Sequence, residues 1–148
     1  MADVPKLRVF VDADVLIAGA ASSNAHSASF VVLQMAEITL IEALTSEQVI
    51  EETERNLREK LPGALTVFRL LMECSLRVVA VPDRLALESY RGLADYKGLP
   101  ILVAAMLAEC PWLVTFNVRH YQPGHPSVKV TTPGEFVMHA RDALSRSG

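Results

Sequence analysis

Two aspartates directly follow an apolar segment near the beginning of the chain. Val9, Phe10 and Val11 predict a strand that is buried on both faces of a parallel sheet. Asp12 and Asp14 come next, one residue apart. Ligands of open α/β sheets bind beyond the carboxyl ends of the strands, and a carboxylate in an apolar setting needs a cation or a hydrogen-bond donor to balance its charge. We therefore expect Asp12 to lie at a divalent metal site. The alternative is that its side chain caps the following turn.

Other polar residues follow the strands predicted further along the chain, and a parallel sheet gathers such residues at one edge. Glu52 lies about two turns into the helix after the second strand. Thr115 could orient a water or a metal ligand, or simply fill a strand position. The candidate residues at this edge are Asp12, Asp14, Thr45, Ser46, Glu52, Asp95, Thr115 and Asn117. Two or more carboxylates there predict a site for Mg²⁺ or Mn²⁺, which prefer oxygen ligands. Such an ion activates water and stabilises the charge that builds up on a phosphodiester.

Alternating strands and helices are expected to position these residues. The apolar pattern predicts strands at 9–11, 39–44, 76–81, 112–115 and 128–131. Helices are predicted at 30–38, from a cap at Thr45 or Ser46 to Pro62, at 64–74, 84–90 and 101–108, and from Pro133 onward. This alternation implies right-handed βαβ units. The predicted fold class is α/β, a three-layer α/β/α sandwich with a central, mostly parallel sheet of about five strands, in a single domain over residues 1–148.

Composition limits the function classes. The chain has 148 residues, 51% of them hydrophobic, but no apolar run approaches the roughly 20 residues that cross a membrane. No secretion signal is visible, and two cysteines fit buried free thiols, so we expect a cytoplasmic protein. The four histidines have no ligand spacing, which argues against zinc. With 14 basic and 17 acidic residues the net charge is −3, so any nucleic acid must be held locally.

Five segments, taken together and in order, resemble a known family. They are 9–19, 46–53, 99–105, 113–117 and 128–136, and they are similar to successive blocks of a PIN domain, in particular of the VapC-like toxin ribonucleases. The resemblance implies a metal-dependent endoribonuclease that uses Mg²⁺ or Mn²⁺ on single-stranded RNA. It also implies the toxin component of a toxin–antitoxin pair, with an antitoxin protein as partner and a homodimer as assembly.

The family gathers four acids at its active site, and the resemblance places them on this chain residue by residue. The first falls on Asp12, with Asp14 as a supporting polar residue, and the second falls on Glu52 or its neighbour Glu51. The third falls on Gly98 and the fourth on Asn117, neither of which is acidic.

Two of the four expected acids are therefore replaced, and the site residues follow from those that remain. The predicted metal ligands are Asp12 and Glu52, with Asp95 as a substitute for the missing third acid. The predicted catalytic set is Asp12, Asp14, Glu52, Thr115 and Asn117. Lys97, Arg119 and His120 flank the expected edge and are either phosphate contacts or ordinary solvated residues.

Two alternatives to an active nuclease follow from the same residues. A catalytically degenerate PIN-like domain could act as an RNA-binding or protein-interaction module. A haloacid-dehalogenase-like phosphatase would use Asp12 as its nucleophile and Asp14 as its acid and base. That family, however, needs an acidic pair after the fourth strand, where this chain has 116–119 without an acid.

Overall fold

The computed structural model describes residues 6–21, 27–38 and 40–147. Within them, strands and helices alternate as the sequence predicts, with one additional helix between the first strand and the helix predicted at 30–38. The strands are β1 (Leu7–Val11), β2 (Ile41–Ser46), β3 (Leu76–Val79), β4 (Trp112–Val114) and β5 (Lys129–Thr131). The helices are α1 (Ala13–Ala21), α2 (Ala28–Glu37), α3 (Glu47–Lys60), α4 (Leu65–Ser75), α5 (Arg84–Ser89), α6 (Leu99–Leu107) and α7 (Pro133–Ser147), with short 3₁₀ helices η1 (Pro62–Ala64) and η2 (Val118–Tyr121).

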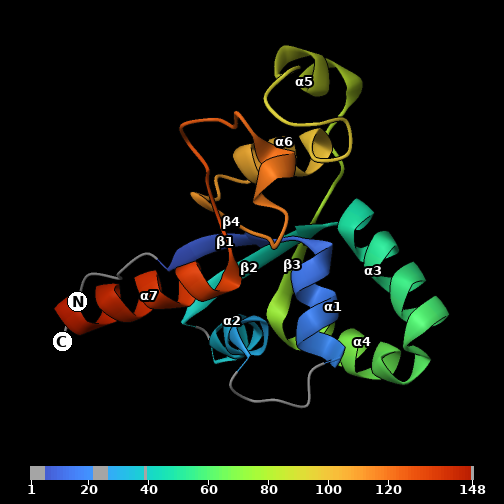
Figure 1. Cartoon of the computed structure of the whole chain (residues 1–148), viewed down its shortest axis with the longest axis vertical. Helices are drawn as coiled ribbons and strands as arrows, with labels where there is room; N and C mark the ends of the chain where they lie inside the picture. The colour runs from blue at the N-terminus through green and yellow to red at the C-terminus, as the bar shows by residue number, and fades with distance from the viewer. Residues whose placement is uncertain (1–5, 22–26, 39, 148) are drawn as a thin grey trace.

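The five strands form one parallel sheet in the order β3-β2-β1-β4-β5. β1 lies at its centre, between β2 and β4 (Figure 1). Val11, the last residue of β1, lies opposite Val114, the last residue of β4. The residues that follow these two strands therefore leave the sheet side by side, which confirms the predicted parallel sheet and brings Asp12 next to Thr115.

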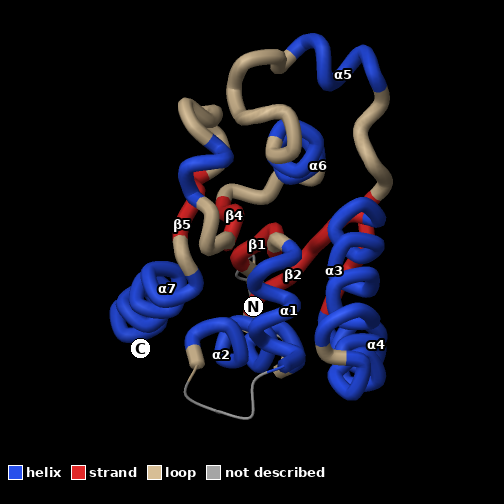
Figure 2. The backbone as a smooth tube through the Cα atoms, turned by 45° about the vertical axis from the view of Figure 1, so that its right-hand side comes forward, coloured by secondary structure: helices blue, strands red, loops and turns tan. Residues whose placement is uncertain are grey.

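The strand order also decides which face of the sheet each helix covers. The chain moves from β1 through β2 to β3 in one direction and then returns past β1 to β4. Right-handed crossovers that run in opposite directions place their helices on opposite faces. Accordingly, α1, α2 and α4 lie on one side of the sheet and α6 on the other (Figure 2). The predicted three-layer α/β/α sandwich is thus confirmed.

The core lies between these layers. Phe10 and Leu113 in the sheet, and Phe136 in α7, are fully buried. Helix α6 is apolar on all sides, and its residues from Ile101 to Ala105 are buried against β2 and β4. A helix that is apolar all round is stable only inside a protein, as the sequence predicts. The packing of this helix on the sheet also positions the segment immediately before it, which includes Gly98.

The boundary between β2 and α3 differs from the predicted one. The strand extends to Ser46, rather than ending at residue 44, and the predicted first residue, Thr39, lies outside the described residues. Ser46 is also the N-cap of α3, because its Oγ accepts from the Val49 amide at 3.4 Å. Thr45 is not the cap: its Oγ1 donates to the Val11 carbonyl at 2.9 Å. The Thr45 side chain therefore ties β2 to the end of β1.

The edge strand β3 is shorter than predicted, for a related reason. It ends at Val79, opposite Ser46, because β2 turns into helix there and offers no further partner.

The prediction that both cysteines are buried is correct for Cys110 and wrong for Cys74, which is exposed. In the part of the chain that the structure describes, no helix has the length and apolarity needed to span a bilayer.

Candidate functional site

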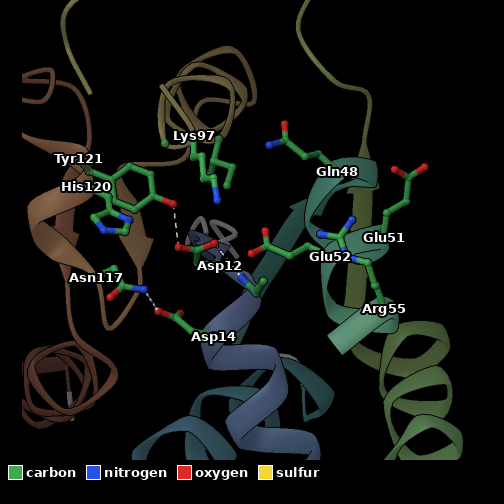
Figure 3. A pocket seen from close by; sticks show the side chains of 13 residues that line it. Asp12, Asp14, Gln48, Glu51, Glu52, Arg55, Lys97, Asn117, His120 and Tyr121 are labelled. Carbon is green, nitrogen blue, oxygen red and sulfur yellow. Dashed lines mark hydrogen bonds between the residues drawn. The ribbon is translucent and has the colours of Figure 1, made fainter. Parts of the chain in front are cut away.

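A pocket of about 390 Å³ opens at the carboxyl edge of the sheet, where β1 and β4 end. These neighbouring strands are the point at which the direction of the crossovers reverses, the usual ligand-binding position of an open α/β sheet. Figure 3 shows its side chains converging from the ends of β1 and β4, the first turns of α3 and the segment before α6. The lining residues are Asp12, Ala13, Asp14, Gln48, Glu51, Glu52, Arg55, Lys97, Gly98, Ile101, Asn117, His120 and Tyr121.

Asp12 lies at the bottom of this pocket and is only 7% exposed. Its Oδ2 accepts from the Thr115 hydroxyl at 2.8 Å and from the Tyr121 hydroxyl at 2.7 Å. Its Oδ1 accepts from the Ala13 amide, the first residue of α1, at 2.8 Å. The carboxylate thus both caps the turn and faces the pocket, so the two interpretations of Asp12 are compatible. Three donors hold it in one orientation, because a buried charge needs such partners.

Tyr121 is a functional side chain that sequence reasoning missed, as is Arg55. Tyr121 comes from η2, is 3% exposed and donates its hydroxyl to Asp12 (Figure 3). Burial, together with the negative charge of Asp12, raises the pKa of Tyr121 far above its usual range, so the hydroxyl keeps its proton and remains a donor. No spacing rule points to this tyrosine, because it reaches Asp12 only through the fold of the 116–121 segment.

The contact predicts a large effect of Tyr121→Phe on stability. The substitution leaves the ring in place and removes one hydrogen bond to a buried carboxylate. We expect it to lower the free energy of unfolding by about 1.5–3 kcal/mol, the usual value for hydrogen bonds to charged groups. Urea unfolding measures the change. Tyr96→Phe is the matched control, since Tyr96 is 94% exposed. Equal midpoints for both variants would contradict the role of the Tyr121 hydroxyl.

Asp14 forms the second carboxylate of the site. Its Oδ2 accepts from the Phe116 amide at 3.1 Å, from the Asn117 side-chain amide at 2.9 Å and, at a longer 3.3 Å, from the Thr115 hydroxyl. Its Oδ1 is buried and has no hydrogen-bond partner among the described residues. Burial, followed by the negative charge of Asp12, raises the pKa of Asp14 to about 6, although the Phe116 and Thr115 hydrogen bonds oppose the shift.

Asn117 and Thr115 connect the two carboxylates. The Thr115 hydroxyl has a single hydrogen and lies closer to Asp12 than to Asp14, while its oxygen accepts from the Asn117 backbone amide at 3.0 Å. The Asn117 side chain donates to Asp14. An aspartate at position 117 would instead set a carboxylate against a carboxylate. The amide at this position is therefore suited to holding Asp14 in place.

Glu52 is brought to the same pocket from the exposed face of α3. Its carboxylate points toward Asp12, whereas that of Glu51 points away (Figure 3). Among the described residues, Glu52 has neither a hydrogen bond nor an ion pair. The fold thereby favours Glu52 over Glu51 as the second acid, a choice that their adjacent positions in the sequence leave open.

The position of the missing third acid has no room for a side chain. A Cβ on Gly98 would lie 2.7 Å from the His120 carbonyl oxygen and 3.1 Å from Asp95 Oδ1. Asp95 itself accepts from the Gly98 amide at 2.7 Å through Oδ1, and its Oδ2 lies 3.7 Å from His120 Nδ1. Asp95 closes the turn before α6 and does not line the pocket of Asp12. The structure therefore does not bring this predicted metal ligand together with Asp12 and Glu52.

The remaining edge residues divide between the pocket and the core. Thr45 and Ser46 are fully buried and occupied as described above, so they do not reach the pocket. Lys97 and His120 do line it, with Lys97 pointing toward Asp12 (Figure 3), whereas Arg119 is absent from its walls. Arg55, on α3, adds another cation. The site thus combines carboxylates with nearby positive charges, a set that can hold both a cation and a phosphate.

The donor set suits a loosely held ion better than a closed metal cage. No three His, Cys, Asp or Glu side chains of the described residues lie close enough together to form a metal cluster. Mg²⁺ nevertheless binds through one or two carboxylates while keeping several waters. Glu52 is unpartnered, and the orphaned, buried Oδ1 of Asp14 adds negative charge beside Asp12. The residues present therefore fit a hydrated Mg²⁺ or Mn²⁺ ion at Asp12 and Glu52.

An open parallel sheet with a carboxylate pocket at its switch point places this chain among the α/β proteins that bind ligands beyond the carboxyl ends of their strands. The model of the PIN domain family matches residues 8–119. The chain therefore belongs to the PIN-domain family, which sets aside the phosphatase alternative. One similar solved structure is the crystal structure of VapBC2 from Rickettsia felis bound to a DNA fragment from their promoter. It has 14% sequence identity and a TM-score of 0.60, and the match covers 85% of this chain and 98% of that one. The comparison with curated proteins found no match.

Proposed function

We propose that this protein is a metal-dependent endoribonuclease and the toxin component of a toxin–antitoxin pair. The observation that carries the proposal is Asp12, a buried carboxylate held by three donors in the same pocket as Glu52. The three hydrogen bonds stabilise this charge and hold the carboxylate in one orientation at the bottom of a pocket, where it can bind a ligand. We further propose that residues 1–148 act as one domain, because the buried hydrophobic residues form one cluster through both helical layers.

Each residue of the site has a distinct part in this function. Asp12 and Glu52 would hold Mg²⁺ or Mn²⁺. Such an ion, when bound, lowers the pKa of a water and stabilises the negative charge of a phosphodiester under attack. Tyr121 and Thr115 orient Asp12 by hydrogen bonding. Asn117 holds Asp14.

The cations of the pocket supply the attraction for the substrate. Lys97 points toward Asp12 from the segment before α6, and Arg55 lies beside Glu52 on α3 (Figure 3). Among the described residues, neither of them has an ion pair. They can therefore neutralise the phosphate of an entering strand. The pocket is a recess of about 390 Å³, and a flexible single strand can direct one of its phosphodiesters into such a recess. We therefore propose single-stranded RNA as the substrate.

The proposed partners rest on family membership and on the similar fold of VapBC2 from Rickettsia felis. An antitoxin protein would block the site by placing a basic residue against Asp12 and Glu52. We also propose a homodimer, as is expected of PIN toxins, and the cytoplasm as the place of action, because the substrate is RNA.

The test compares RNA cleavage by the parent and by Asp12→Asn in the presence of Mg²⁺ or Mn²⁺. We expect Asp12→Asn to lower the cleavage rate at least about 100-fold, since even the loss of a partner of a metal ligand typically reduces activity 10- to 100-fold. Asp142→Asn, at an exposed position in α7, controls for the loss of one negative charge. Undiminished cleavage by purified Asp12→Asn would refute the assignment of the nuclease activity to this pocket.

A second pair of variants in the same assay avoids any effect on folding. Glu52 and Glu51 are adjacent and both exposed, but only Glu52 points toward Asp12 (Figure 3). We expect Glu52→Gln to abolish cleavage and Glu51→Gln to retain it. A loss confined to Glu51→Gln would assign the second acid to Glu51 instead.

The second candidate function is a catalytically degenerate PIN domain that binds RNA without cleaving it. It is favoured by the replacement of the third and fourth acids by Gly98 and Asn117. In this case the parent protein would bind RNA in EDTA, and neither Mg²⁺ nor Mn²⁺ would produce cleavage. The same assay therefore distinguishes the two functions.

A further inference from the structure

A second pocket, of about 770 Å³, adjoins the candidate active site. Gln48 and Lys97 line both pockets, so the two share part of one wall. The second pocket is otherwise built by α5, the start of α6 and the segment that connects them. These elements stand at the end of the molecule where α3 begins (Figure 1). A chain-like ligand that enters the first pocket can therefore extend into the second.

The most unusual residue of this second pocket is Tyr96. Its side chain is 94% exposed, so it contributes nothing to the core. An aromatic ring left in solvent beside a pocket is free to stack on a ligand, and every nucleobase offers a flat face for such stacking. The half-buried Leu87 and Pro100 add apolar surface to the walls of the same pocket.

The charges of the second pocket also favour a polyanion. Arg84, Arg91 and Lys97 line it, and all three are exposed. Of its two acids, Glu88 pairs with Arg91 at 3.5 Å, whereas Asp95 accepts from the Gly98 amide and keeps its charge, so the cations of the lining exceed its acids by one. Among the described residues, Arg84 and Lys97 have no ion pair. In a chain with a net charge of −3, these cations form a local positive surface beside an acidic site.

We propose that the second pocket binds a nucleotide of single-stranded RNA next to the phosphodiester that enters the pocket of Asp12. Tyr96 stacks on the base, Arg84 pairs with a phosphate, and Lys97, which lines both pockets, contacts the phosphate between the two positions. The inference deepens the proposed function by adding a binding site for the neighbouring nucleotide. It concerns binding alone and does not require the site to cleave.

Binding of a labelled octaribonucleotide, measured by fluorescence anisotropy in EDTA, tests the stacking step. We expect Tyr96→Ala to weaken binding about 5- to 150-fold, the range that corresponds to 1–3 kcal/mol for one stacked base. Tyr96→Phe keeps the ring and should retain the affinity of the parent. Because Tyr96 is exposed, neither variant threatens the fold. Unchanged affinity in Tyr96→Ala overturns the proposal, as does an equal loss in Tyr96→Phe.

The salt dependence of the same binding tests the phosphate contact independently. Each phosphate contact to a single strand contributes about −0.7 to the slope of log K against log salt concentration. Arg84→Ala should therefore make the slope less negative by about 0.7, whereas Tyr96→Ala should leave it unchanged. Arg69→Ala, at an exposed position in α4, is the matched control and should not alter the slope. Equal slopes for Arg84→Ala and the parent would refute the contact.

The outcomes separate this inference from the proposed nuclease activity. Binding that depends on Tyr96 without any cleavage supports the second pocket and refutes the nuclease. Cleavage that depends on Asp12, with RNA binding unaffected by Tyr96→Ala, supports the nuclease and overturns the inference. A polyglutamate peptide tests whether the pocket instead binds an acidic protein segment. If Tyr96→Ala weakens the binding of this peptide but not of RNA, the pocket receives a protein and the inference is wrong.

Discussion

Gly98→Asp is expected to destabilise the protein by about 3 kcal/mol or more, although it introduces an acid where the family has one. The new Cβ would lie 2.7 Å from the His120 carbonyl oxygen, which is backbone and cannot rotate away. Overpacking of this kind typically costs about 1–3 kcal/mol, and a charged group placed among buried atoms adds to it. A lower urea midpoint and a lower melting temperature are the measurements that check the prediction.

Gly134→Asp is the matched control for this experiment. A Cβ on Gly134 meets nothing within 4 Å, and the residue lies in the first turn of α7, where a negative charge is favourable. We expect this variant to be as stable as the parent or slightly more so. If Gly98→Asp were equally stable and gained Mg²⁺-dependent stabilisation, the steric explanation for the missing third acid would be wrong.

Asp14→Asn is expected to change how stability depends on pH. The pKa of Asp14 is raised from 3.8 to about 6 in the folded protein, mainly by burial and then by Asp12. Between these values the folded state binds more protons than the unfolded state, so stability falls as pH rises from about 4 to 6 and levels off above 6. The Asp14→Asn variant lacks this titrating carboxylate, so its stability should decrease less over the same pH range.

The expected size of this effect is about 1–2 kcal/mol, after allowing for the partial exposure of the carboxylate. Urea unfolding of the parent and of Asp14→Asn at pH 4 and at pH 7 measures it. The free energy of unfolding of the variant, relative to that of the parent, should be higher at pH 7 than at pH 4 by that amount. Any constant cost of the buried amide cancels in this comparison. Asp142→Asn again controls for charge, and a difference that does not vary with pH would contradict the raised pKa.

The pairing of Asp12 with Glu52 shows how much of the site local sequence patterns can predict. Asp12 follows a strand whose three apolar residues demand burial, and α3 begins at a recognisable serine cap. Strand ends and helix starts of a parallel sheet must lie at one edge, so the two carboxylates could be placed together in advance. Which of Glu51 and Glu52 faces the site depends on the rotation of α3, which Val49, Thr53 and Leu57 decide by packing on the core.

The sequence by itself determined the class of fold and the edge at which the chemistry lies, because apolar periodicity is a local property and the alternation of strands with helices implies parallel strands. Only the tertiary structure decided which side chains contact the carboxylates at that edge. Strand order set β4 beside β1, so that Thr115 and Tyr121, more than 100 residues away along the chain, could bind Asp12. The same packing brings the His120 carbonyl against Gly98 and excludes a third acid there. Contacts between segments so distant in sequence depend on steric fit in three dimensions, which no pattern of residue types records.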